Sequence, residues 1–530
     1  MTGRLAIDFG TSNTVLAVWD ADRKEGIPLH LPEYGRQFQQ GDETVSVIPS
    51  LIHYAAGGRR WIGNQVGQRK LAHSRYTFRW MKRYISHRSP MRVQVDGQEI
   101  TPFKAGQDFL STLLLFAAQQ LDLHDEEIAL SVPVESFEHY ENWIANVLAS
   151  AGFQRYRLID EPSAAALGYG AHILPGNVYL IFDFGGGTLH TAIVLMESEE
   201  NAAAGKRCRV LGKAGRSIGG TTIDQWLFSE VLHQANRRDS DEDIRRISGA
   251  ILVECERVKE TLSFQEEAGL SVSDAETGAR IEAHFDRRSF EALLDRHELF
   301  TEIHQVLRSA LNAARERGYD EDAIQAVLMV GGSSQIPAVQ QALSQRFGRD
   351  KVFFNRPLDA IARGAAAFNA GVDFFDHIQH DYAIRYVDPH QGDYAYRMIV
   401  PQGTPYPTQD PVARLAVKAS YDGQQQLGIA IFEMGKAARS TAEPNVELVF
   451  DPGGAARLIP LTAQEMEQRT QFWMNEQQPT FLQANPPAHQ GEPRFEVEFR
   501  VDANKRLTIN ARDLHTDRWV YQDYPVVKLT

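Results

Sequence analysis

LIFDFGGGTLHTAIV, from Leu180 to Val194, and LAIDFGTSNTVLAV, from Leu5 to Val18, share one pattern. Each stretch has an apolar run, an Asp-Phe-Gly turn with small residues and Thr, and a second apolar run. Apolar runs of this length on either side of a Gly-containing turn predict two buried β-strands joined as a hairpin. The chain therefore contains the same strand–turn–strand unit twice.

The residues of the two turns predict a phosphate site. Glycine N–H groups can face an anion because no Cβ stands in the way, and Thr or Ser hydroxyls add hydrogen bonds. An Asp beside phosphate is reasonable only if a hydrated Mg²⁺ lies between them. We therefore expect two half-sites for Mg-polyphosphate on either side of a cleft. The first contains Asp8, Gly10, Thr11, Ser12 and Asn13, and the second contains Asp183, Gly185, Gly186, Gly187 and Thr188.

A third strand-to-glycine turn strengthens this interpretation. VLMVGGSSQIPAV (Val327 to Val339) is an apolar run that ends in Gly331, Gly332 and Ser333 before a helix start. The glycine pair would let a base or ribose approach the backbone closely. Three such turns, far apart in sequence, favour one shared nucleotide site.

Composition excludes several classes of protein. A chain of 530 residues is long enough for two or three domains. The net charge of -14 argues against general binding to nucleic acid or to an anionic membrane surface. Two cysteines, Cys208 and Cys255, are too few for a disulfide framework. No signal peptide or membrane-spanning apolar stretch is evident, so we expect a cytoplasmic protein.

The sequence pattern changes after Gly371. The first ~370 residues alternate between strand-like and helix-like segments, which is typical of an α/β fold. From Asp381 onward, short alternating runs separated by turn residues predict an antiparallel β-sandwich domain. Within it, Thr462 to Gln490 interrupts the pattern and resembles a helix followed by a Gln/Pro-rich loop. That stretch is either an inserted interaction element or a solvated loop.

These motifs, in this order, resemble the actin, sugar-kinase and heat-shock ATPase superfamily, and within it the DnaK-type (heat shock protein 70) chaperones. RLIDEPSAAALGYG (157–170), IGGTTID (218–224), CERVKETLS (255–263) and MVGGSSQIP (329–337) follow the two phosphate turns in family order. PPAHQGEPRFEVEFRVDANKRLTINARD (486–513) resembles the β substrate-binding domain of the family. The resemblance covers nearly the whole chain.

The resemblance implies a domain plan. It consists of a two-lobed actin-like ATPase domain at 1–371, an interdomain linker at 372–380 and a β-sandwich domain at 381–530 with an insertion near 462–485. The family usually adds a helical lid, and we expect none here because the last β-type segment runs to Thr530. The implied ligands are ATP or ADP with Mg²⁺, and the implied partners are an unfolded peptide or protein client and co-chaperones.

The resemblance also implies roles for single residues. Asp8 and Asp183 would hold Mg²⁺, and Glu161 would orient the attacking water. The residues implied in nucleotide contacts are Gly10, Thr11, Ser12, Asn13, Gly185, Gly186, Gly187, Thr188, Gly219, Gly220, Glu256, Lys259, Ser263, Gly331, Gly332 and Ser333. Leu427 and Ile429 match strand positions of the peptide-binding pocket, and the alternative is that they are plain sandwich core.

Two departures from the family bear on hydrolysis. The family places a catalytic Lys where this chain has Gly67, in IGNQVGQRK. Lys70 is the candidate replacement in the catalytic set, since its stem is long enough to reach back, as is that of Arg69; the alternative is a solvated surface lysine. An Asp of the second phosphate turn is here His190, which cannot supply a negative charge near Mg²⁺.

We therefore expect Mg-ATP binding to survive and hydrolysis to be slow. Loss of one positioned charge contact costs on the order of 2.7–4 kcal/mol of barrier, if oxyanion-hole donors are a fair guide. Three hypotheses remain open. The first is a lidless chaperone that couples nucleotide state to peptide binding. The second is a nucleotide-sensing scaffold with little ATPase activity and one dedicated protein partner. The third is a small-molecule kinase of the same superfamily, for which no acceptor-binding Asp stands out.

Overall fold

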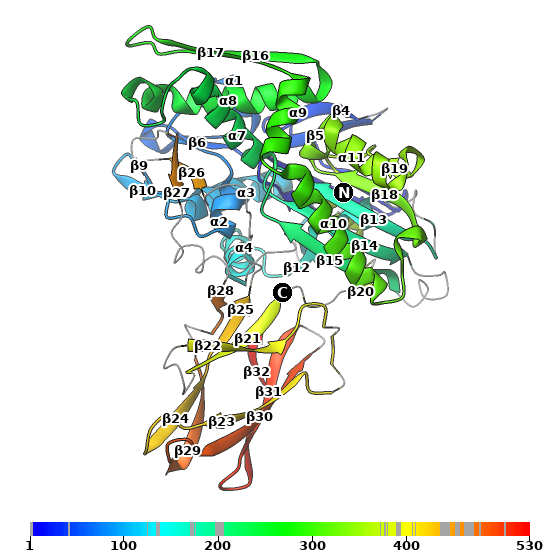
Figure 1. The fold of residues 1–530 in the computed structure, drawn as a ribbon, viewed down its shortest axis with the longest axis vertical. Helices are drawn as coiled ribbons and strands as arrows, with labels where there is room; N and C mark the ends of the chain where they lie inside the picture. Colours follow the sequence, from blue (N-terminus) through cyan, green and yellow to red (C-terminus); the bar gives the residue numbers. More distant parts are fainter. Residues whose placement is uncertain are drawn as a thin grey trace. The chain divides into compact units, whose positions relative to one another are not determined.

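The computed structural model divides the chain into two compact units (Figure 1). Unit 1 contains Met1–Val134, Asn142–Phe375 and Ala438–Leu461, and unit 2 contains Glu135–Glu141, Asp376–Ala437 and Thr462–Thr530. The residues described are 4–40, 43–123, 126–133, 138–169, 174, 176–196, 206–371, 373–375, 378, 380–387, 394–404, 406–408, 410–434, 446–450, 456–460, 471–475, 479–502 and 505–529.

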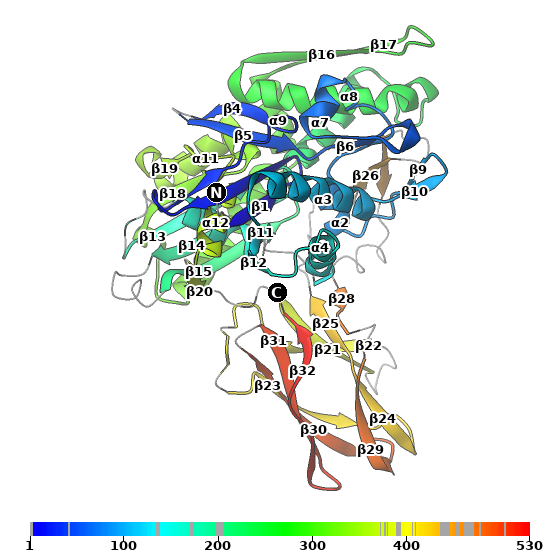
Figure 2. The ribbon, with the colours of Figure 1, turned by 180° about the vertical axis from the view of Figure 1, so that it is seen from behind.

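The first sheet of unit 1 is built around the first Asp-Phe-Gly turn. Its strands run in the order β12-β11-β1-β2-β5-β4, and β3 also pairs with β2 (Figure 2). β1 lies parallel to β11 and antiparallel to β2, so β1 and β2 form the expected hairpin. The strands are β1 (Leu5–Phe9), β2 (Asn13–Asp20), β3 (Glu25–Pro28), β4 (Arg36–Gln40), β5 (Glu43–Pro49), β11 (Ile128–Val132) and β12 (Tyr156–Asp160).

The second sheet repeats this arrangement around the second turn. Its order is β19-β18-β13-β14-β15-β20, with β13 parallel to β18 and antiparallel to β14. β13, β18 and β19 thus correspond to β1, β11 and β12, and the repeated sequence motif is a repeated topology. The strands are β13 (Val178–Phe184), β14 (Leu189–Met196), β15 (Lys206–Arg216), β18 (Ile324–Val330), β19 (Val352–Phe353) and β20 (Asp373–Phe375).

Two helices of small residues lie between the sheets. α5 (Glu161–Tyr169) packs on β13 and β14, whereas α12 (Ala360–Asn369) packs on β1, β2, β3 and β11. The two helices cross so closely that a Cβ at Gly364 would lie 1.7 Å from the carbonyl oxygen of Ala164. A Cβ at Gly168 would likewise lie 1.8 Å from the carbonyl oxygen of Ala360. Glycine therefore sets the distance between the helices, and one buried apolar cluster joins both sheets to them.

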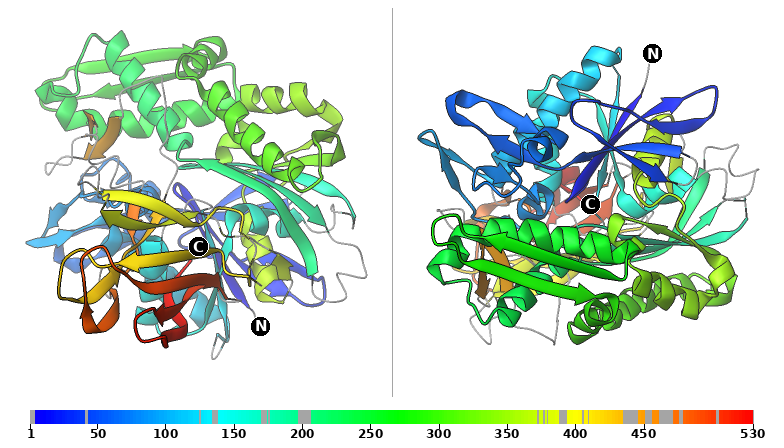
Figure 3. Two further views of the ribbon diagram at one scale, coloured as in Figure 1. Left: turned by 60° about the horizontal axis from the view of Figure 1, so that its bottom comes forward. Right: turned by 90° about the horizontal axis from the view of Figure 1, so that it is seen from above.

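The remaining elements of unit 1 surround these layers. α10 covers β14 and β15, and the hairpin of β16 and β17 runs along α8 (Figures 1 and 3). The helices are α1 (Asn64–Gln68), α2 (Met81–Ser86), α3 (Pro102–Gln120), α4 (Glu138–Ser150), α7 (Gly220–Gln234), α8 (Glu242–Phe264), α9 (Arg287–Arg296), α10 (Leu299–Arg315) and α11 (Pro337–Phe347). The smaller strands are β6 (Ile52–Tyr54), β7 (Arg60–Ile62), β8 (Thr77–Phe78), β9 (Val93–Val95), β10 (Gln98–Ile100), β16 (Glu267–Ser273), β17 (Arg280–Asp286), β26 (Val446–Phe450) and β27 (Ala456–Pro460).

Unit 2 is antiparallel β-structure around one core. Its sheets have the orders β22-β21-β25-β28, β23-β30-β31-β32 and β24-β29. The strands are β21 (Asp381–Val387), β22 (Tyr394–Val400), β23 (Ala413–Lys418), β24 (Gln424–Ile429), β25 (Ile431–Met434), β28 (Gln471–Trp473), β29 (Thr480–Ala488), β30 (Pro493–Val501), β31 (Arg506–Asp513) and β32 (Arg518–Lys528). Leu427 and Ile429 are 2% and 1% exposed and belong to the core of this unit.

The structure refines the expected boundaries. Asp373–Phe375, in the expected linker, forms β20 and pairs with β15 of unit 1, while 372, 376, 377 and 379 lie outside the described residues. β26 and β27 group with unit 1, although they follow the start of the expected β domain. In the expected insertion, 462–470 and 476–478 lie outside the described residues. Strands β28 and β29 occupy part of the stretch for which the sequence predicts a helix followed by a loop, and β29 is a strand because it pairs along β24. No helix in the described part of the chain is long and apolar enough to cross a membrane.

Candidate nucleotide site

The two Asp-Phe-Gly turns lie against each other. A Cβ at Gly186 would lie 2.5 Å from Ser12 Oγ, and one at Gly187 would lie 2.4 Å from Thr11 Oγ1. These distances are shorter than real Cβ contacts, so any larger residue at either position would displace the hydroxyl group that it meets. The structure thus brings the backbone of the second turn beside the hydroxyl groups of the first, as a shared phosphate site requires.

The third glycine turn, at Gly331 to Ser333, lies against the second turn at Phe184 and Gly185. The carbonyl oxygen of Gly185 accepts hydrogen bonds from the backbone N–H of Gly220 at 3.0 Å and from Ser333 Oγ at 2.9 Å. Gly331 has a φ of +84° and lies so close to Phe184 that a Cβ would be 2.3 Å from its carbonyl oxygen. Both the left-handed backbone and the close approach require glycine here.

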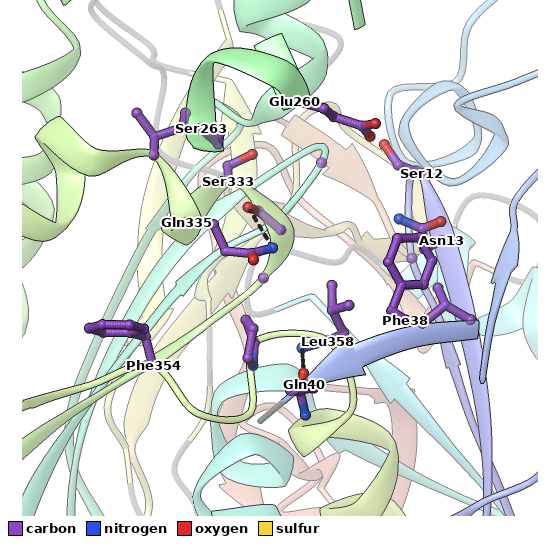
Figure 4. Close-up of a pocket in the computed structure, with 18 of the residues that line it drawn as sticks. Ser12, Asn13, Phe38, Gln40, Glu260, Ser263, Ser333, Gln335, Phe354 and Leu358 are labelled. Atoms are coloured by element: carbon purple, nitrogen blue, oxygen red, sulfur yellow. Dashed lines mark hydrogen bonds between the residues drawn. The ribbon is translucent and has the colours of Figure 1, made fainter. Parts of the chain in front are cut away.

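A cleft of about 750 Å³ opens above the three turns. Figure 4 shows Ser12 and Asn13 on one side, and Ser263, Ser333 and Gln335 on the other. Apolar side chains, including Phe38, Phe354 and Leu358, complete its wall. The sequence-predicted residues that line the cleft are Asp8, Gly10, Thr11, Ser12, Asn13, Gly186, Gly220, Glu256, Lys259, Ser263, Gly331, Gly332 and Ser333. A polar base with an apolar wall suits a phosphorylated ligand with a ring system.

The α8 residues reach this cleft from one helix face. Glu256, Lys259 and Ser263 follow the i, i+3, i+7 spacing that places side chains on one side of a helix. Lys259 is buried, and its Nζ lies 2.7 Å from Asp224 Oδ1 and donates to the carbonyl oxygen of Gly220 at 3.0 Å. This contact fixes α8 to the start of α7, where Gly219 and Gly220 lie.

Three carboxylates lie at the base of the site: those of Glu161 and Asp183 are buried, and that of Asp8 is partly buried. Burial raises the pKa of Asp8 to about 6, although the Lys82 ammonium lowers it. Burial likewise raises the pKa of Asp183 to about 7, and the charge of Glu161 acts in the same direction. Burial would also raise the pKa of Glu161, but the Lys82 ammonium and the His190 ring outweigh it and lower the pKa to about 2. Asp8 and Asp183 therefore carry negative charge that the protein does not fully compensate.

A hydrated Mg²⁺ fits Asp8 and Asp183. Both are oxygen ligands, Asp183 is buried and Asp8 is partly buried, and a cation beside them would offset the burial that raises the pKa of each carboxyl group. Ser131 Oγ donates to Asp8 Oδ1 at 2.6 Å and orients that carboxylate. In a bound complex these aspartates would hold the metal, and the glycine turns would present N–H groups to the phosphates.

His190 lies inside the acidic cluster. β13 and β14 place Asp183 directly opposite His190, and His190 Nδ1 lies 3.5 Å from Glu161 Oε2. Ligand atoms of Glu161, Asp183 and His190 lie within 4.8 Å of one another, a spacing that could hold a metal. However, Glu161 already forms an ion pair with a lysine. A metal there would face that positive charge, so the Asp8–Asp183 pair is the better magnesium site.

That lysine, Lys82, is a candidate site residue that sequence reasoning missed. It lies on α2, its side chain is 6% exposed, and its Nζ forms an ion pair with Glu161. The sequence carries no clear signal for it, because α2 reads MKRYIS and Arg83 follows Lys82 directly; only the structure shows Lys82 buried with Met81, Tyr84 and Ile85. A buried lysine is rare unless it is paired, so its position indicates a specific partner.

The sequence-predicted replacement for the missing lysine lies elsewhere. Lys70 is exposed, whereas Lys82 is buried; neither lysine is among the residues that line the cleft or the smaller cavity beside it. The Arg69 guanidinium carbon lies 3.8 Å above the Trp61 ring. Gly67 lines the smaller cavity, of about 280 Å³, together with Thr11, Ser12 and Asn13. The structure therefore brings together the predicted residues of the three turns and of α8, but not Lys70.

Comparison with known proteins agrees with this geometry. The family described as Hsp70 protein matches residues 86–448. The Heat shock 70 kDa protein BIP3 of Oryza sativa subsp. japonica is 26% identical, over 97% of this chain and 74% of its own length. The Chaperone protein DnaK of Thermosipho africanus (strain TCF52B) is 24% identical, over 97% of this chain and 78% of its own length.

Proposed function

Because the chain belongs to the Hsp70 family, we propose that it is an ATP-binding molecular chaperone whose nucleotide state controls its affinity for a peptide or protein. One observation carries the nucleotide part of this proposal. Two glycine turns from hairpins of equal topology lie against each other at the base of a cleft, where Asp8 lines the cleft and Asp183 is buried.

The proposal assigns ATP or ADP with Mg²⁺ to the cleft. The two repeated sheets act as two lobes that hold the nucleotide between them. Thr11, Ser12 and Thr188 contact the terminal phosphates, and Glu161 orients the attacking water. The side chains of Glu256, Lys259 and Ser263 face the adenosine, next to the apolar wall of the cleft.

The proposal assigns the client to unit 2. Its antiparallel sheets suit binding of an extended peptide by backbone pairing at a strand edge. Leu427 and Ile429 belong to the buried core of this unit, so they support the fold of the binding domain. A client is an unfolded peptide or protein, and co-chaperones act on the cycle.

Equilibrium binding of a fluorescent ATP analogue to the full chain tests the nucleotide site. We expect binding that depends on Mg²⁺ and is competed by ATP and ADP. Gly186→Ala should weaken it by about 10-fold or more, because the added Cβ meets Ser12 and displaces the backbone donors. Gly269→Ala, on β16, is the matched control, since its Cβ finds only an ordinary contact at 3.5 Å. Absence of Mg²⁺-dependent binding in the wild type would refute the proposal.

A second measurement tests whether nucleotide state and peptide affinity are coupled. A labelled unfolded peptide is titrated with the full chain without nucleotide, with ADP and with ATP. We expect at least a fivefold difference in peptide affinity between the ADP and ATP states. Equal affinities in all three states would refute the coupling while leaving nucleotide binding intact, which is the behaviour of a nucleotide-sensing scaffold.

A further inference from the structure

Lys82 carries a positive charge into the acidic cluster from a helix that the phosphate turns do not include. We propose that Lys82 is the cation of the phosphate site, which stabilises the terminal phosphate of bound ATP in place of the lysine absent at position 67. This inference rests on the proposed nucleotide site and goes beyond it, because it assigns hydrolytic competence to a residue outside every motif quoted above.

The backbone holds Lys82 in place. Trp80, the residue before α2, has a left-handed backbone with φ of +56° and is 2% exposed. A bulky residue in this region is a true outlier, and surrounding structure must enforce it. On the next residue of α2, Arg83 donates to Thr221 Oγ1 of α7 at 2.7 Å. The helix is thus tied on both sides of Lys82, so the ammonium has a defined position.

The charge of the site requires such a cation. Lys82 forms its ion pair with Glu161, and its charge also acts on Asp8 and on Asp183. When Mg²⁺ binds the two aspartates, the polyphosphate adds further negative charge near Glu161. An ammonium has three N–H donors and carries its charge whichever acceptors it contacts, so Lys82 can act on a phosphate oxygen through charge while it stays paired with Glu161. In a buried site, the interaction between an ammonium and a phosphate oxygen is stronger than in water.

The cations predicted from sequence do not fill this role. Lys70 is exposed, and Arg69 lies over Trp61. At Gly67 an added Cβ would have one neighbour within 4 Å, Asn64 Oδ1 at 3.9 Å, so a side chain fits there without a clash. Position 67 therefore has room for a side chain but carries none, and the proposed cation, Lys82, lies on α2.

The chemical step leaves Lys82 unchanged. In hydrolysis the oxygen of water forms a bond to the terminal phosphorus, and the bond from that phosphorus to the bridging oxygen breaks. ADP takes the bridging oxygen, and the protons of water end on inorganic phosphate and solvent. Lys82 contributes charge to the phosphate oxygens as this occurs, which is the main task of the protein in phosphoryl transfer.

Single-turnover hydrolysis of preloaded ATP by the full chain tests the proposal, with the affinity for a fluorescent ADP analogue measured on the same samples. Lys82→Met should slow hydrolysis by about 10²–10³-fold, the effect of removing one positioned donor. The affinity for ADP should change by less than about 10-fold, because ADP lacks the terminal phosphate. Lys104→Met is the matched control, since Lys104 also pairs with a carboxylate, Asp108, but lies 47% exposed on α3.

A rescue experiment separates this role from a structural one. Gly67→Lys in the Lys82→Met background should recover at least 10-fold of the lost rate, because a lysine at 67 enters the cavity beside the same turn. In the otherwise wild-type chain, Gly67→Lys should change the rate by less than about threefold, because the site already has its cation. A Lys82 with only a structural role would give no rescue.

Three outcomes would overturn the proposal. Lys82→Met could hydrolyse ATP at the wild-type rate. Lys70→Met could abolish hydrolysis while Lys82→Met does not. Lys82→Met could slow hydrolysis with no rescue by Gly67→Lys, although urea unfolding without nucleotide shows both variants folded. Each differs from failure of the nucleotide site itself, in which the ADP analogue would not bind even the wild-type chain.

Discussion

The crossing of α5 and α12 allows a sharp test of how the glycines build unit 1. A Cβ at Gly364 would lie 1.7 Å from the carbonyl oxygen of Ala164 and 2.7 Å from the backbone nitrogen of Gly168. Ordinary contact begins near 3.4 Å, so the added carbon is about 1.7 Å too close to backbone that has no rotamer to change. The helices must therefore separate.

Two effects of opposite sign decide the outcome of Gly364→Ala. Alanine favours a helix over glycine by about 1 kcal/mol. Overpacking costs about 1–3 kcal/mol and occasionally more, and a backbone-to-backbone clash between buried helices belongs at the upper end. We expect a net loss of about 2 kcal/mol. Because α5 begins at Glu161, the same displacement should also slow ATP hydrolysis.

Urea unfolding of the full chain, followed by tryptophan fluorescence and far-ultraviolet circular dichroism, measures this loss. Gly67→Ala is the matched control, because Gly67 is also helical but has open space around it. Its free energy of unfolding should rise by up to about 1 kcal/mol. The reasoning is refuted if both variants shift the urea midpoint in the same direction.

Three further predictions concern other sites. Leu427→Ala should lower the free energy of unfolding by about 2–5 kcal/mol, because Leu427 is 2% exposed in the core of unit 2; a loss below 1 kcal/mol in urea unfolding would favour an open peptide pocket instead. His190→Asp should destabilise the nucleotide-free chain in thermal unfolding and make its stability more dependent on Mg²⁺, because it adds a carboxylate at a fully buried position beside those of Glu161 and Asp183. Arg494 pairs with Asp513 at 2.9 Å; burial opposes ionisation of Asp513, but hydrogen bonds from Arg494 and from the backbone keep its pKa below the usual value. That pair should stabilise unit 2 fully above about pH 4, and its contribution should be lost as the pH falls further, so Asp513→Asn should flatten the acid limb of stability against pH.

Much of the site was predictable because it depends on short-range sequence patterns. Glycine spacing predicts the three turns, and helical spacing predicts that Glu256 and Ser263 share a face. The register of the second hairpin could also have been read from the sequence. Counting outward from its turn places Asp183 opposite His190, so a ring among the carboxylates follows from cross-strand pairing.

The position of Lys82 could not have been predicted in this way. Its approach to Glu161 depends on the left-handed backbone at Trp80 and on how α2 lies against α5 and α7, which are far away in sequence. Motif comparison directed attention to position 67 and its neighbours. Tertiary packing instead brings Lys82 of α2 to Glu161, and local sequence patterns do not encode that contact.

The packing of the β region also could not be predicted from the sequence. The alternation in β24 shows that Leu427 and Ile429 share a face, but it does not say whether that face meets a core or a pocket. Pairing of β24 with β29 shows that this face meets the core, since Leu427 lies opposite Leu482 and both belong to the buried cluster. A partner strand that far along the chain is decided by the whole domain.

The repeated sheet order has a consequence for how this site can diverge. In a symmetric homodimer, every substitution at a two-fold site appears twice, once from each subunit. Here both halves are encoded in one chain, so each can change alone. The residue opposite Asp8 is Val15, whereas the residue opposite Asp183 is His190. A pseudo-symmetric site of this kind can keep one half for binding and alter the chemistry of the other.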